Sequence, residues 1–209
     1  MAVKRHLLNN EVPTQVGGGT VIYVTPDWHR WHPEPEHREE GGTRGIIESI
    51  RRAMAISIPR QVGYEFIAER EKQHVQRARA QLQKATSLKL LGPADAERLP
   101  IFSLRFRWDT GELHYGFVVR LLNDLFVIQA RGGSSCSAPY GHTLLDLTPK
   151  HSEALATEVR RGFGCLRPGW VRFNLHWLNS VEEANYVFSA MTLIARWGNR
   201  LLPSYTLDT

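Results

Sequence analysis

The second half of the chain alternates between short apolar segments with strand periodicity and longer segments with helical periodicity. Strand-like segments occupy residues 101–108, 126–128 and 170–177, and helical segments occupy residues 114–125, 151–161 and 180–198. The last helix opens with Ser180 and Glu183, which have the spacing of a capping box. Because strands and helices that alternate along a chain pack as layers, this half predicts an α/β lobe.

The first half predicts fewer regular elements and a domain boundary near its end. We expect short strands at residues 1–8 and 20–25 and a loop at residues 26–40. A helix follows, and its apolar side contains Ile46, Ile47, Ile50, Met54 and Ile58. Pro59 is expected to end that helix, and a long charged helix is expected over residues 62–83. Such a helix often connects two lobes, so we place the boundary at residues 59–63 and a loop-rich segment at residues 88–100.

Composition limits the class of protein. With 209 residues, of which 42% are hydrophobic and 22% charged, the chain is long enough for one sizeable core. It has no apolar run near the roughly 20 residues of a membrane span, and its N-terminus lacks the apolar segment of a secretory signal. Two cysteines make a disulfide framework implausible, which indicates a reducing, cytoplasmic setting. The net charge of +5 is scattered among acidic residues, so we expect a small anionic ligand rather than nucleic acid or a membrane.

Residues 126–142, FVIQARGGSSCSAPYGH, form the strongest candidate for a functional site. A short strand is expected to present Arg131, and the glycine- and serine-rich loop after it contains Cys136. A second strand-like segment presents Arg172. Two arginines on strands beside a loop cysteine could hold a small carboxylate substrate, because guanidinium groups bind carboxylates bidentately. The alternative reading is that Cys136 is a buried structural thiol.

A second candidate lies before the helix of the first half. Thr43 is expected to be the N-cap of that helix, and capping alone explains its presence. Because Gly41 and Gly42 precede it, a phosphate site at the helix N-terminus is the other reading. Three nearby histidines, at positions 29, 32 and 37, lack a fourth ligand at a defined spacing, so we predict no metal site.

The order of these motifs resembles the C-terminal half of class-V aminotransferases, and more narrowly the cysteine-desulfurase-like branch of fold-type I pyridoxal-phosphate enzymes. The motifs that carry the resemblance are GGGT at residues 17–20, Gly42-Thr43 before a helix, R-G-G-x-x-C-x-x-P-Y-G-H from Arg131, R-P-G-x-x-R from Arg167, and a final helix followed by LLP. The resemblance covers nearly the whole chain. It implies that residues 1–60 are the end of the large, cofactor-binding domain and residues 61–209 the small C-terminal domain.

The resemblance also implies roles for individual residues. Gly42 and Thr43 match the pair that contacts the phosphate of pyridoxal 5'-phosphate across a dimer interface. Arg172 matches the arginine that binds the α-carboxylate of the amino-acid substrate. Arg131 matches the arginine that opens the cysteine loop, and Cys136 matches the thiol that attacks the substrate sulfur in desulfurases.

This chain departs from the family pattern in two places. Ser134 and Ser135 precede the loop cysteine where desulfurases usually carry a histidine, so desulfurase and transaminase chemistry both remain open. The family's cofactor-binding lysine has no counterpart among the chain's lysines, which are Lys4, Lys72, Lys84, Lys89 and Lys150. We therefore expect a truncated enzyme that is inactive alone and forms a homodimer or pairs with a full-length partner. The alternative is a non-catalytic interaction module derived from the same family.

Overall fold

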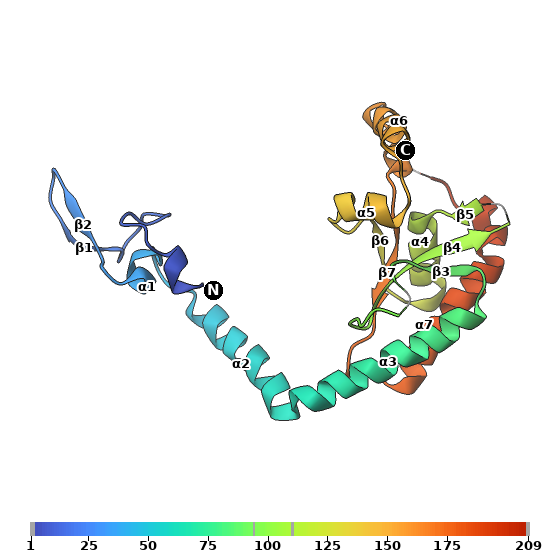
Figure 1. The fold of residues 1–209 in the computed structure, drawn as a ribbon, viewed down its shortest axis with the longest axis horizontal. Helices are drawn as coiled ribbons and strands as arrows, with labels where there is room; N and C mark the ends of the chain where they lie inside the picture. Colours follow the sequence, from blue (N-terminus) through green and yellow to red (C-terminus); the bar gives the residue numbers. More distant parts are fainter. Residues whose placement is uncertain (1–2, 94, 110, 208–209) are drawn as a thin grey trace. The chain divides into compact units, whose positions relative to one another are not determined.

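The computed structural model describes residues 3–93, 95–109 and 111–207, which divide into two compact units (Figure 1). The first unit ends at Val62 and the second begins at Gly63. This division falls within residues 59–63, the segment in which the sequence predicts a boundary.

The first unit is built from short elements and one long helix. They are the 3₁₀ helix η1 (Arg5–Leu7), strands β1 (Val21–Val24) and β2 (His29–Trp31), and helices α1 (Pro35–Arg38) and α2 (Ile46–Val62). Strands β1 and β2 pair antiparallel, with Val24 opposite His29. The turn between them closes on Thr25, whose backbone N–H donates to the Trp28 carbonyl (2.8 Å) and whose hydroxyl accepts from the Trp28 N–H (3.0 Å).

Several predictions for the first unit are wrong. Residues 5–7 form a 3₁₀ helix instead of a strand, and residues 1 and 2 lie outside the described part. The expected loop at residues 26–40 contains β2 and α1. Pro59 does not end α2, which continues to Val62. The helix ends because Gly63 has a φ of +97°, a conformation that glycine adopts without the steric cost of a side chain.

The second unit is a five-stranded antiparallel sheet with helices. Its strands are β3 (Leu88–Leu90), β4 (Ile101–Trp108), β5 (Gly111–Leu113), β6 (Arg131–Gly133) and β7 (Trp170–Asn174). Their order is β3-β4-β7-β6, and β5 pairs with β4. The helices are α3 (Tyr64–Lys84), α4 (Tyr115–Phe126), α5 (Ala138–Leu144), α6 (Pro149–Arg160) and α7 (Val181–Trp197), with 3₁₀ helices η2 (Gly164–Leu166) and η3 (Gly198–Ser204). The mixed α/β class predicted from the sequence is confirmed.

One face of this sheet forms the core. Phe102, Leu104 and Phe106 alternate along β4 and are at most 1% exposed. They join a single cluster with apolar residues of β7, α3, α4 and α7. Phe102 stacks on Phe173 of β7, with ring centroids 5.1 Å apart, and Phe173 meets Phe188 of α7 edge-on. Because successive side chains of a strand point to opposite faces, the residues between these core positions are directed to the other face of the sheet.

The predicted strand at residues 126–128 is wrong, and its local geometry shows why. Phe126 is the last residue of α4, and Val127 takes a left-handed conformation with a φ of 55°. The Val127 N–H donates to the Asn123 carbonyl (3.1 Å) and the Ile128 N–H to the Leu122 carbonyl (3.0 Å). These two bonds form a Schellman motif, which usually has glycine where this chain has valine. The next strand in the chain, β6, begins at Arg131.

Other elements of the second unit agree with the sequence. The predicted strand at residues 101–108 is confirmed, as are the helices corresponding to α3, α4, α6 and α7. The capping box of α7 is present, because the Ser180 hydroxyl accepts from the Glu183 N–H (3.1 Å) and the Glu183 carboxylate accepts from the Ser180 N–H (2.8 Å). The loop that contains Cys136 leads into helix α5, and strand β3 lies within the segment expected to be loop-rich.

Candidate functional site

Strands β6 and β7 bring two of the predicted site residues together. In their antiparallel register Arg131 lies directly opposite Arg172. Residues directly opposite each other share one face of the sheet, with Cβ atoms about 4.5–5.5 Å apart. The core residues Val171 and Phe173 flank Arg172 on its strand, so both arginines belong to the face turned away from the core.

Neither guanidinium makes an ion pair with an acidic side chain within the described residues. Two like charges directly opposite each other are destabilising, and an anion bound between them relieves the repulsion. A guanidinium group offers a planar fork of donors that fits a carboxylate in two parallel hydrogen bonds. The pair is therefore suited to a small ligand that carries a carboxylate.

The loop after β6 places the predicted cysteine beside this pair. The Arg131 Nη2 atom lies 3.8 Å from the Cys136 Sγ atom, and the Cys136 side chain is exposed. Ser135 and Cys136 both have left-handed backbones, with φ of 54° and 62°. The Ser137 hydroxyl and N–H both donate to the Ser134 carbonyl and hold the loop (2.7 and 3.1 Å). Two consecutive non-glycine residues in this conformation cost free energy, and such strain is concentrated at functional sites. Since the thiol is exposed, the structure does not support the alternative of a buried structural cysteine.

Glycine residues allow the end of β6 and the segment just before β7 to pack closely together. A Cβ atom added to Gly169 would lie 2.5 Å from the Gly133 Cα and 2.7 Å from the Tyr115 ring. Tyr115 itself is held by its hydroxyl, which donates to the Arg167 carbonyl (3.1 Å), and burial raises the pKa of Tyr115 above its ordinary value. A Cβ atom added to Gly141 of α5 would lie 3.1 Å from the ring of Trp170, so α5 packs at the start of β7.

Two further cations, Lys89 and Arg105, lie on the same sheet face without belonging to a recognisable sequence motif. Arg105 lies opposite Lys89 of β3, and Ser103 lies opposite Arg172, so Lys89 and Arg105 share the face of the arginine pair. Arg105 makes an ion pair with Glu112 of β5. The alternation of β4 could have located Arg105, but β3 is too short to be recognised from its periodicity.

Gly42 and Thr43 lie in the first unit. Gly42 has a φ of +84°, and its N–H donates to the Gly18 carbonyl (2.8 Å). The backbones of the two glycine segments touch, because a Cβ atom added to Gly17 would lie 3.0 Å from the Gly41 Cα. Thr20, which closes the first segment, is fully buried, and its hydroxyl donates to the Gly17 carbonyl (2.6 Å). The GGGT motif therefore supports the segment that carries Gly42.

The prediction that Thr43 is the N-cap of α2 is wrong, since this helix begins at Ile46. Thr43 is instead an exposed residue of the preceding turn. No hydrogen bond engages the Thr43 hydroxyl or the N–H groups of residues 43–45 in the described part of the chain. Free N–H groups and a free hydroxyl near a helix N-terminus fit a phosphate. These residues are therefore compatible with the phosphate of pyridoxal 5'-phosphate.

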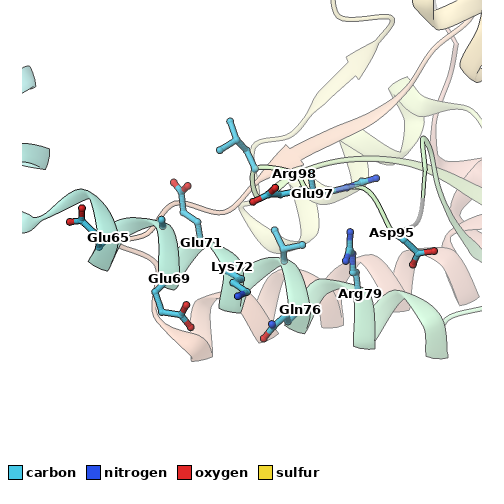
Figure 2. A pocket seen from close by; sticks show the side chains of 12 residues that line it. Glu65, Glu69, Glu71, Lys72, Gln76, Arg79, Asp95, Glu97 and Arg98 are labelled. Atoms are coloured by element: carbon cyan, nitrogen blue, oxygen red, sulfur yellow. The ribbon is translucent and has the colours of Figure 1, made fainter.

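Among the described residues, no group of three or more His, Cys, Asp and Glu side chains is arranged to hold a metal ion. No helix in this part is long and apolar enough to cross a membrane. A cavity of about 880 Å³ lies between α3 and residues 95–99 (Figure 2). None of the predicted site residues lines it, and its lining mixes acidic side chains with Lys72, Arg79 and Arg98, so it favours no single class of ligand.

Comparisons with known proteins cover most of the chain. The family model for aminotransferase class-V matches residues 1–187. A probable cysteine desulfurase from Staphylococcus epidermidis is 26% identical over 136 residues, which are 65% of this chain and 32% of that protein. A cysteine desulfurase from Serratia proteamaculans is 29% identical over 136 residues, with the same two coverages.

Two solved structures of cysteine desulfurases have a fold similar to that of this chain. The apo cysteine desulfurase from Thermococcus onnurineus NA1 superposes with a TM-score of 0.71 at 24% identity, over 93% of this chain and 42% of that one. The cysteine desulfurase CsdA (S-sulfonic acid) from Escherichia coli superposes with a TM-score of 0.64 at 17% identity, over 97% of this chain and 42% of that one. The chain thus spans about a third of the length of the curated relatives it matches.

Proposed function

The chain belongs to the aminotransferase class-V family, and from this premise we propose that it forms the substrate-binding part of a pyridoxal-phosphate enzyme acting on an amino acid. The observation that carries the proposal is the pairing of Arg131 with Arg172 on one sheet face, with the Cys136 thiol 3.8 Å from Arg131. Arg131 and Cys136 are five residues apart, and strand pairing brings Arg172 from a distant part of the sequence opposite Arg131.

In this proposal Arg172 binds the α-carboxylate of the substrate. Hydrogen bonds to charged groups contribute about 1.5–3 kcal/mol each, and a bidentate pair also fixes the orientation of the amino acid. Arg131 adds positive charge beside the carboxylate and beside the Cys136 sulfur. The Cys136 side chain is exposed, so its sulfur is accessible to a bound substrate.

Thr43 would hold the phosphate of the cofactor through its hydroxyl and the free N–H groups of residues 43–45. Gly42, whose own N–H donates to the Gly18 carbonyl, would shape the turn before them. When bound, pyridoxal phosphate supplies the electron sink for reactions at the α-carbon of an amino acid. None of the chain's five lysines lies in a motif that matches the family's cofactor-binding lysine. We therefore propose that the chain as given does not turn over substrate alone and works with a second polypeptide, either another copy or a full-length relative, in the cytoplasm.

The names of the relatives suggest cysteine as the substrate, with Cys136 as the thiol that accepts its sulfur. The exposure of Cys136 and its left-handed backbone agree with that role. The second candidate function is a non-catalytic interaction module. It is favoured by α2, whose apolar side chains Ile46, Ile47 and Met54 are each at least 60% exposed.

Calorimetric titration of the full chain with L-alanine and with L-alaninamide tests the proposal, because only the first carries a carboxylate. Arg172→Lys should weaken binding of L-alanine about tenfold or more, since a lysine loses the bidentate geometry. Arg105→Lys is the matched control, because Arg105 lies on the same face but pairs with Glu112. Equal affinity of the two ligands, or equal losses for the two variants, would exclude Arg172 as a carboxylate site. The same titration is repeated with a full-length relative present.

A further inference from the structure

One buried histidine of the second unit has no role in the proposed site. His74 lies on α3 and is 1% exposed, and neither ring nitrogen has a hydrogen-bond partner among the described residues. Lys72 and Gln76, two positions before and after it, line the cavity of Figure 2. Residues two positions apart on a helix differ by about 200°, so His74 lies on the opposite side of α3. Its neighbours Val75 and Ala78 belong to the core cluster that also contains α7.

Positive charges surround the His74 ring. Arg70 and Arg77 flank it along α3, and the Arg70 guanidinium donates to the Asn179 carbonyl (3.2 Å). Asn179 immediately precedes Ser180, the N-cap of α7. The Asn179 carbonyl that accepts from Arg70 is also the backbone group that favours protonation of His74. A neutral ring tolerates this environment, whereas a protonated ring would bury a positive charge beside the half-buried Arg70 and Arg77.

The remaining charged groups near this junction do not offset that cost. Glu71 and the Asn179 backbone favour protonation of His74, but burial outweighs them, and Arg70 and Arg77 act in the same direction as burial. From α7, Glu182 interacts with Arg77, and the Glu183 carboxylate is engaged by the N-cap of the helix. The pKa of His74 is consequently held below its ordinary value, first by burial and then by the two arginines.

We propose that His74 is an acid-sensitive latch that holds α3 against the start of α7 only while its ring is neutral. The direction of the pH dependence follows from the linkage between proton binding and folding. A histidine whose folded-state pKa is lowered costs no stability above its unfolded pKa of about 6.5, and the folded state loses stability as the pH falls below that value. Because α3 begins directly after Gly63, the latch acts on the helix that joins the second unit to the first. The proposal does not depend on the cofactor or the substrate.

Hydrogen exchange of the full chain at pH 7.5 and 5.5, corrected for the intrinsic effect of pH, tests the latch. Lowering the pH should accelerate amide exchange in α3 and the first turn of α7 severalfold, with smaller changes in α6. His74→Phe and His74→Gln, which cannot protonate, should remove the acceleration. His151→Gln is the matched control, because His151 is an exposed histidine on α6.

The proposal is overturned if the two His74 variants keep the acid-induced acceleration or if His151→Gln abolishes it. Should both His74 variants fail to fold, an NMR titration of the unmodified protein decides the question. The latch requires that the His74 ring stay neutral in the folded protein at a pH where exposed histidines are already protonated. A ring that titrates together with His151 would overturn it.

Discussion

Gly169→Ala tests the close contact between β6 and β7 that places Arg131 opposite Arg172. The added Cβ would lie 2.5 Å from the Gly133 Cα, 2.8 Å from the Gly133 carbonyl carbon and 2.7 Å from the Tyr115 ring. Two of these atoms belong to the backbone of β6 and cannot move aside by a rotamer change. The strand itself must therefore shift, which separates the arginine pair.

Overpacking of this kind costs about 1–3 kcal/mol, and we expect the upper part of that range because backbone atoms clash. The melting temperature should then fall by roughly 5–10 °C, at about 2–4 °C per kcal/mol for a chain of this size. Thermal and urea unfolding of the full chain measure both quantities. Gly164→Ala is the matched control, since an added Cβ would meet no atom within 4 Å there. If Gly169→Ala were no less stable than Gly164→Ala, the β6–β7 packing described above would be incorrect.

Three further predictions concern the whole chain. Limited alkylation of the native protein, mapped by mass spectrometry, should label the exposed Cys136 faster than the partly buried Cys165, and the reverse order would contradict the proposed reactive loop. Light scattering should show dimers or larger species because α2 exposes its apolar side, and a stable, monodisperse monomer would contradict association through α2. Incubation with pyridoxal phosphate followed by borohydride reduction should modify several lysines weakly. Stoichiometric modification of one lysine, with Lys4 and Lys89 the candidates to examine first, would show that the chain does contain a cofactor lysine.

Sequence periodicity located the elements that are long and amphipathic. The strand at residues 101–108 and the capped helix α7 were predicted because each carries its own repeating pattern or cap. The apolar run at residues 126–128 predicts a strand, whereas Val127 ends α4 in a conformation that glycine usually adopts. Local pattern alone could not reveal a Schellman motif without its glycine.

The residues of the candidate site could be predicted from the sequence, but their arrangement in space could not. Arg131, Arg172 and Cys136 could be selected by residue type and motif order, but the register that sets Arg131 opposite Arg172 depends on pairing between strands far apart in the sequence. Thr43 lies shortly before the first periodic apolar residue, which predicts an N-cap, yet α2 begins only at Ile46. His74 gave no signal, because its lack of partners becomes visible only when α3 and α7 are packed.

The proposed function requires that Arg172 and Arg131 together bind the carboxylate of an amino acid. NMR of the arginine side-chain Nε–H groups during titration with L-alanine tests it most directly, because each guanidinium reports its own contact. We predict saturable shifts of the Arg172 and Arg131 signals, little change at Arg105, and no such response to L-alaninamide. Signals of Arg172 that stay unchanged, or that move no more than those of Arg105, would contradict the claim.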